Sequence, residues 1–129
     1  MVGKYSPQDW KFGFFQKVWD IVRSVPTGRV ITYGGIAALI SPPYHTTKRG
    51  YFFLAPRWVG KALSECPRDV PWHRVINSKG EISYRKSGSH VLQKELLIIE
   101  GIKFQSNGKI DLKVFGWSTD QSSGKIGDE

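Results

Sequence analysis

Proline and glycine interrupt this chain at short intervals, so no regular element can run for long. These residues end helices or make turns because proline lacks a backbone N–H and glycine tolerates left-handed conformations. The interruptions fall near residue 7 and at 26–28, 41–43, 71, 79–80, 101 and 107–108. A chain of 129 residues is enough for one core and short for two. We therefore expect one compact domain over 1–117 and a flexible polar tail over 118–129.

Four helices are predicted between these breaks. The first follows Ser6 and Pro7, residue types that favour a helix start, and has apolar residues at helical spacing. A β-branched pair, Val30 and Ile31, precedes Thr32, which can cap the second helix. The polar, basic and aromatic segment 41–54 has no periodicity and is predicted to be a surface loop. The predicted helices are 7–25, 33–40, 55–65 and 90–100.

The apolar pattern predicts a mostly helical α/β domain. We expect Val59, Ala62 and Leu63 to face inward from the third helix, and residues 92, 96 and 99 from the fourth. The second and third helices fit a helix-turn-helix variant with an elongated turn. Two short apolar runs, 102–104 and 110–112, flank a turn at Asn107 and Gly108 and predict a small C-terminal hairpin.

The net charge of +8 is unevenly distributed. Segment 29–86 has ten basic residues against three acidic ones, so it holds +7 of the total. A basic stretch of this kind on a small domain is typical of a protein that binds a polyanion. Charge therefore makes a nucleic acid the first candidate partner.

Composition argues against several other classes. The single cysteine, Cys66, cannot form an intramolecular disulfide, and the three histidines lie outside any clustered zinc spacing. No apolar run is long enough for a membrane span, and the first residues do not resemble a signal peptide. We expect a monomer without metal or cofactor, in the cytoplasm or nucleoid (the nucleus in a eukaryote), neither secreted nor bound to a membrane.

Four motifs carry the most specific signal. They are Gly28-Arg-Val-Ile-Thr-Tyr-Gly-Gly-Ile-Ala, Arg57-Trp-Val-Gly-Lys-Ala-Leu, Pro71-Trp-His-Arg-Val-Ile-Asn and Glu100-Gly101. In this order, over about residues 12–117, the chain resembles the C-terminal, DNA-binding domain of O6-alkylguanine-DNA alkyltransferases. Those enzymes have Pro-Cys-His-Arg in the third motif. The Pro-Trp-His-Arg version here resembles the alkyltransferase-like proteins, which lack the reactive cysteine.

Trp72 has a direct chemical consequence. Alkyl transfer needs a thiolate activated by a neighbouring base. An indole has no ionisable nucleophile and offers only one N–H donor. We therefore expect no catalytic residue in this chain. By resemblance, His73, Glu100 and Asn77 remain as a structural hydrogen-bonding network.

The resemblance also implies how DNA is bound. Tyr33 matches the tyrosine that crowds the DNA backbone and helps to rotate a nucleotide out of the duplex. Arg57 matches the arginine that fills the space left by the extruded base. An arginine at the start of the third helix is unfavourable for the helix dipole, so a role in binding would explain it. Lys48, Arg49 and Lys61 are expected to contact DNA, with the third helix in the minor groove.

The everted base needs a pocket, and the resemblance indicates its walls. Trp72 is expected to form one wall and add stacking surface. Arg85 matches an arginine with which the non-enzymatic relatives probe the guanine edge. Val75 and Leu63 are expected to complete the pocket.

These expectations lead to one functional hypothesis. The chain binds O6-alkylguanine lesions in duplex DNA by nucleotide flipping, without alkyl transfer, and marks them for the proteins of nucleotide excision repair. One alternative is an alkyltransferase that acts through Cys66. Another is a sequence-specific transcriptional regulator, although residues 57–65 contain no asparagine or glutamine to read base edges. The 41–54 segment either lengthens the DNA contact, docks a partner through its aromatic residues, or is a surface insertion.

Overall fold

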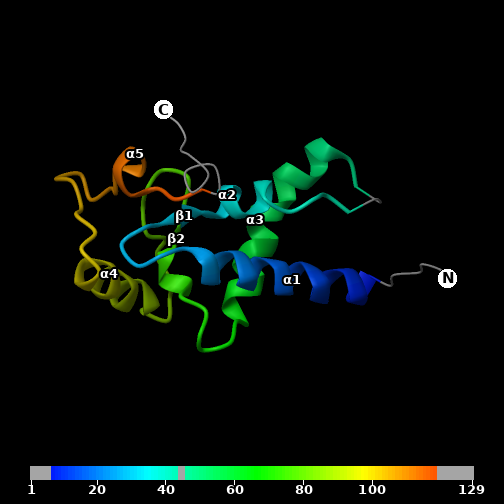
Figure 1. Cartoon of the computed structure of the whole chain (residues 1–129), viewed down its shortest axis with the longest axis horizontal. Coiled ribbons are helices and arrows are strands. Elements are labelled where there is room, and N and C mark those ends of the chain that lie inside the picture. Colours follow the sequence, from blue (N-terminus) through cyan, green and yellow to red (C-terminus); the bar gives the residue numbers. More distant parts are fainter. Residues whose placement is uncertain (1–6, 44–45, 119–129) are drawn as a thin grey trace.

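The computed structural model describes residues 7–43 and 46–118. Helices dominate these residues, and two short strands form a small sheet (Figure 1). This arrangement confirms the predicted fold class. In chain order the elements are α1 (Pro7–Ser24), β1 (Ile31–Thr32), α2 (Tyr33–Ala38), α3 (Lys48–Ser64), a 3-10 turn η1 (Trp72–Arg74), β2 (Val75–Ile76), α4 (Ser89–Ile99) and α5 (Leu112–Phe115).

The helices α1, α2 and α3 enclose the larger of two apolar cores. In Figure 1 α3 crosses α1, and buried residues from both helices, such as Val18, Val22 and Val59, meet between them. The Trp19 indole N–H donates to the Ala62 carbonyl at 2.8 Å, which fastens α1 to the last turns of α3. The position of α3 is thus fixed from its inner side.

A parallel two-stranded sheet connects this part to the rest of the domain. Ile31 pairs with Val75, and Thr32 pairs with Ile76. The predicted cap is confirmed, since the Thr32 hydroxyl accepts from Gly35 N at 2.9 Å and opens α2. Because η1 leads directly into β2, the sheet places the Pro-Trp-His-Arg motif close to the start of α2. The smaller core behind the sheet consists of Val30, Ile76, Leu97, Ile102 and Ile110.

The prediction of a surface loop over 41–54 is wrong from residue 48 onward. The helix α3 begins at Lys48, where the Thr47 hydroxyl accepts from Gly50 N. Tyr51 is fully buried, and its hydroxyl donates to the Ala37 carbonyl of α2 at 2.8 Å. Pro56, which the sequence analysis placed in the first helical turn, lies in the middle of α3, where a proline removes one backbone hydrogen bond and its ring crowds the carbonyl one turn earlier. The predicted helix-turn-helix pair stands, but with a shorter connection.

The predicted inner face of α4 is also wrong. Leu92 and Ile99 are 49% and 80% exposed, whereas Gln93 and Leu97 are buried. The Gln93 side-chain amide donates to the His73 and Val75 carbonyls at 3.1 and 2.8 Å. A glutamine can face inward here because its amide N–H groups are paired with two backbone carbonyls.

The predicted C-terminal hairpin is reduced to one antiparallel bridge between Phe104 and Ile110. Leu112, expected in its second strand, begins α5 instead, because Asp111 caps that helix by accepting from Lys113 N. The predicted left-handed stop at Gly101 is confirmed by its φ of 96°. The expected cap at Ser6 and the tail beyond residue 118 lie outside the described residues.

The helical reading of residues 48–54 predicts opposite outcomes for two neighbouring aromatics. Tyr51→Ala removes a fully buried ring and its hydrogen bond, so it should lower the free energy of unfolding by about 4 kcal/mol. Phe53 is 82% exposed, so Phe53→Ala should change that free energy by less than about 0.5 kcal/mol. Urea unfolding of both variants tests this. Equal small effects would restore the surface loop.

Candidate nucleic-acid interface

A cavity of about 710 Å3 opens between α3, the segment after it, and the start of α4. Its size lies within the usual range of sites for small molecules. The walls combine an indole, aliphatic surface, two arginines and several hydroxyl groups. They consist of Gly60, Leu63, Ser64, Cys66, Pro67, Arg68, Trp72, Arg85, Ser87 and Ser89.

Three of the four predicted pocket residues line this cavity. Leu63 comes from α3, Trp72 from η1, and Arg85 from the segment that leads into α4. The fourth prediction, Val75, is wrong. It is not among the residues that line the cavity, and its side chain is buried in the larger core.

Arg85 connects the cavity to the start of α2. Its Nη2 donates to the Tyr33 hydroxyl at 2.6 Å. Its Nη1 is buried and has no hydrogen-bond partner among the described residues. The Arg85 backbone N–H donates to Nδ1 of His90, which ties this segment to α4. The cavity wall thus contains a cationic donor that is held in place and retains unused hydrogen-bonding capacity.

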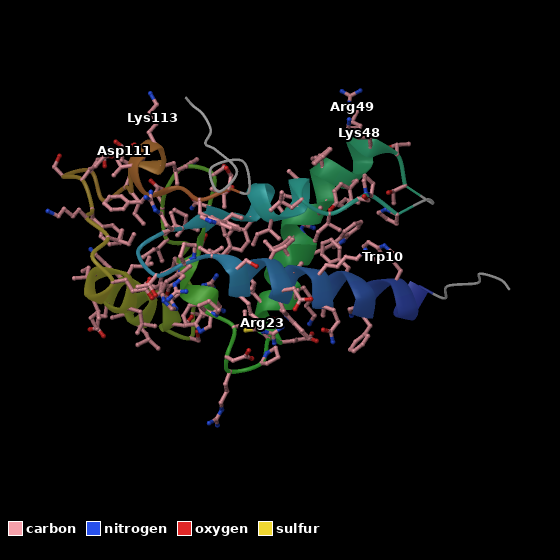
Figure 2. The ribbon with its side chains drawn as sticks, viewed as in Figure 1. Trp10, Arg23, Lys48, Arg49, Asp111 and Lys113 are labelled. Atoms are coloured by element: carbon pink, nitrogen blue, oxygen red, sulfur yellow. The ribbon has the colours of Figure 1, made fainter. Side chains whose placement is uncertain are left out.

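The exposed surface of α3 is strongly basic. This helix contains four basic residues, Lys48, Arg49, Arg57 and Lys61, and no acidic one. All four are exposed, and Lys61 forms an ion pair with Glu65 at 3.0 Å. Figure 2 shows Lys48 and Arg49 at the far end of α3, pointing away from the rest of the molecule. A surface of this composition attracts a polyanion.

Arg57 lies in the middle of α3 and not at its start, so the argument from the helix dipole does not apply. It precedes Gly60, a cavity residue, by three positions and therefore lies one turn from the cavity on the same face. A Cβ added to Gly60 would meet nothing within 4 Å, so the protein's own packing does not require a glycine there. Its effect is to leave the helix surface open beside the cavity.

The Glu100 carboxylate holds the motif that carries Trp72. It accepts from Arg74 Nη2 at 2.7 Å and from Gly28 N at 3.1 Å, and it lies 2.7 Å from His73 Nε2. Burial raises the pKa of Glu100, but the hydrogen bonds from Arg74, His73 and Gly28 outweigh it and lower the pKa to about 2. The predicted contact of His73 with Glu100 is present, and the carboxylate is charged at neutral pH.

Arg74 is a central residue that the sequence analysis missed. Besides Glu100, its guanidinium donates to the Val25 carbonyl at 2.8 Å and to the Thr27 hydroxyl at 2.9 Å. Its position in the third motif, directly after His73, was the sequence feature that could have identified it. Asn77 was predicted in the same network but shapes a separate turn, where its Oδ1 accepts from Lys79 N and Glu81 N. That turn starts the segment leading to Arg85.

The segment that carries Cys66 is held by an ion pair the sequence analysis also missed. Arg23 of α1 donates to both carboxylate oxygens of Asp69, at 2.8 and 3.2 Å, and to Asp20 at 2.9 Å. Figure 2 shows Arg23 on the side of α1 near this segment. Cys66 itself lines the cavity, and burial raises the pKa of its thiol. A thiol with a raised pKa is a poor nucleophile at neutral pH.

Other kinds of site find no support in the described residues. No group of three or more His, Cys, Asp or Glu side chains there is arranged to hold a metal ion. No helix in 7–43 or 46–118 is long and apolar enough to cross a membrane.

Comparison with known proteins gives a consistent family. Residues 13–102 match the family model described as 6-O-methylguanine DNA methyltransferase, DNA binding domain. A protein of Escherichia coli named DNA base-flipping protein is 36% identical over 119 residues, which cover 87% of this chain and 83% of that protein. Alkyltransferase-like protein 1 of Schizosaccharomyces pombe is 36% identical over 111 residues, 81% of this chain and 94% of that protein.

A solved structure agrees with these sequence matches. The crystal structure of S. pombe Atl1 in complex with damaged DNA containing O6-carboxymethylguanine superimposes with a TM-score of 0.67. The identity is 37%, and the match covers 83% of this chain and 96% of that chain. The predicted resemblance to the alkyltransferase-like proteins is therefore confirmed.

The lowered pKa of Glu100 predicts acid sensitivity. Because the folded pKa of about 2 lies below the ordinary 4.5, the stabilisation is complete above pH 4.5 and is lost as the pH falls toward 2. The full contribution is about 3 kcal/mol, by the conversion of a pKa shift to free energy. Unfolding measured between pH 7 and pH 2 should show this loss.

The variant Glu100→Gln leaves Arg74 without its counter-charge and should cost about 3 kcal/mol or more at pH 7. Its stability should also depend less on pH below 4.5. Glu95→Gln, on the exposed face of α4, is the matched control and should leave both properties unchanged. A Glu100→Gln protein with the stability and acid response of the wild type would contradict a structural role for the network.

Proposed function

This chain belongs to the family of the 6-O-methylguanine DNA methyltransferase DNA-binding domain, and we propose that it binds O6-alkylguanine in duplex DNA by nucleotide flipping, without alkyl transfer. One observation carries the proposal. The cavity with Trp72 and Arg85 in its walls opens beside α3, a helix that bears four exposed basic residues and no acidic one. The names of two relatives support it, and so does the damaged-DNA complex of one of them, S. pombe Atl1.

Docking on DNA is assigned to the basic face of α3. Exposed lysine and arginine side chains replace counterions along the phosphate backbone and give affinity that falls as salt rises. Lys48, Arg49 and Lys61 supply such contacts. The described part of α3 offers no asparagine or glutamine, so it lacks the amides that pair with adenine edges in the major groove. This favours docking in the minor groove, independent of sequence, over the role of a sequence-specific regulator.

Nucleotide flipping is assigned to Tyr33 and Arg57. Extruding a base costs a few kcal/mol of stacking and pairing, which the protein must offset. Arg57 is exposed, with a long side chain that reaches into the gap left by the base. Tyr33 lies at the start of α2 and is held toward the cavity by Arg85. Both residues are thus connected to cavity residues, Arg57 through its place one turn before Gly60 and Tyr33 through its hydrogen bond to Arg85.

Recognition of the everted base is assigned to Trp72 and Arg85. The indole offers a flat apolar surface for stacking. Arg85 lines the cavity, and its guanidinium can donate to O6 or N7 of guanine, the two acceptors on that base edge. Since no bond has to be broken, the geometry places no in-line requirement on the alkyl group.

The absence of alkyl transfer follows from the same residues. Trp72 has no nucleophilic atom that a base can activate. His73 is engaged with Glu100 and stabilises the local fold. Cys66 is the remaining thiol, and burial keeps it protonated at neutral pH. A lesion that is bound and not repaired needs a downstream reader, and by family resemblance we assign that role to nucleotide excision repair proteins.

Arg57→Ala should remove most of the preference for the lesion. Wild-type protein should bind a duplex with one O6-methylguanine at least tenfold more tightly than the same duplex with guanine, by fluorescence anisotropy at moderate salt. The variant should lose about tenfold in affinity for the lesion, because nothing then fills the gap left by the base.

Lys48→Ala is the control for general electrostatics. It should weaken binding to both duplexes equally and lower the slope of log affinity against log salt by about one. Equal affinity of the wild type for the two duplexes would overturn the proposed function. A preference confined to one flanking sequence would instead support the regulator.

Incubation with DNA that carries a radiolabelled alkyl group on O6 should leave the protein unlabelled. An active alkyltransferase of this family measured in parallel supplies the positive control. Cys66→Ala should bind the lesion as the wild type does, because the thiol is one small part of the cavity wall. Stoichiometric label on Cys66 would show that the chain is an enzyme.

A further inference from the structure

The outer face of α3 continues for two turns beyond Arg57. Tyr51, Ala55, Val59 and Ala62 point into the core, so the opposite side of the helix faces solvent. Phe53 lies on that opposite side, four residues before Arg57, and its ring is 82% exposed. A large aromatic side chain is thus exposed on the face assigned to DNA, where it is free to contact the duplex.

We propose that Phe53 is an apolar wedge that enters the minor groove beside the everted nucleotide, while Arg49 holds the phosphates beyond it. This inference rests on the proposed function and adds a second point of distortion to the DNA. Phenylalanine is one of the side chains that minor-groove proteins insert between base steps, where it unstacks and kinks the duplex.

Helix geometry places the three side chains along one line. At 1.5 Å per residue, Phe53 lies about 6 Å and Arg49 about 12 Å from Arg57 along the axis. Base pairs stack at about 3.4 Å, so Phe53 would act about two steps from the space that Arg57 fills. Gly50 and Gly60 on the same side of α3 add no bulk, which lets the DNA backbone approach the helix.

Charge favours DNA over a protein as the occupant of this face. Phe53 stands between Arg49 and Arg57, and α3 contains no acidic residue. Figure 2 shows Lys48 and Arg49 directed outward at the same end of the helix. The outer face of α3 is also continuous with the cavity, because Gly60 and Ser64 of this helix line the cavity. DNA suits all of these residues as a single ligand, because its phosphates can pair with the basic side chains and its base faces can contact Phe53.

The test places a 2-aminopurine, whose fluorescence rises on unstacking, two steps from O6-methylguanine on either side. With the wild-type full chain, fluorescence should rise at one of the two positions. Phe53→Ala should abolish that rise and weaken binding to the duplex about tenfold, the effect expected for loss of one aromatic–base contact. Phe53→Leu keeps an apolar wedge and should retain most of the rise.

Phe12→Ala is the matched control. Phe12 is another exposed phenylalanine, and it lies on α1. The helix α1 packs against the inner side of α3, away from the face assigned to DNA. This variant should behave as the wild type in both measurements. Unchanged fluorescence and affinity in Phe53→Ala, with the wild-type lesion preference intact, would overturn the wedge and leave the proposed function standing. A wild type without lesion preference would overturn the proposed function itself.

Discussion

The arrangement of this domain depends on one buried carboxylate. Glu100, at the end of α4, accepts hydrogen bonds from Arg74 and from the backbone of Gly28, and it pairs with His73. Three segments far apart in the chain meet at this group. Because the other end of the Arg74 guanidinium binds the Val25 carbonyl, the same contact also fixes the end of α1. Trp72 immediately precedes the two residues that Glu100 holds, so the carboxylate sets the position of one cavity wall.

A carboxylate–histidine pair often orients a catalytic base. Here the neighbouring side chain is an indole, so the pair has no nucleophile to activate. The Glu100 carboxylate nevertheless has its hydrogen-bond donors, and its lowered pKa shows that they favour the charged form of this group. A network of this kind has a structural use that does not depend on chemistry. It keeps η1 against α4 while the walls of the cavity remain open.

The inner side of α3 stabilises the fold, and its outer side is assigned to DNA binding. Its inner side packs fully, and Tyr51 bonds to α2. Its outer side combines features that do not help folding: like charges, an exposed phenylalanine, and glycine at position 60, where alanine would favour the helix. Residues that do not suit their local structure are expected mainly at functional sites. In this molecule they gather on one face beside one cavity.

The sequence was informative where a residue's local role agrees with its type. Thr32 caps α2, Gly101 ends α4, and the four motifs identify the family. It misled where a residue serves a less usual role. Pro56 resembled a first-turn proline, which hid the first two turns of α3, and Gln93 was absent from the predicted inner face of α4 although it is buried and binds two backbone carbonyls. The bonds of Arg74 and of Arg23 join positions 26 and 46 residues apart, and no local pattern indicates such pairs.

The central claim is that a damaged guanine enters the cavity between α3 and α4 and leaves it chemically unchanged. A crystal structure of the full chain with a duplex containing O6-methylguanine tests this most directly. We expect an everted guanine stacked against Trp72, with Arg85 at its O6 edge and the methyl group still on oxygen. A guanine that remains stacked in an undistorted duplex, or a methyl group on the Cys66 sulfur, would contradict it.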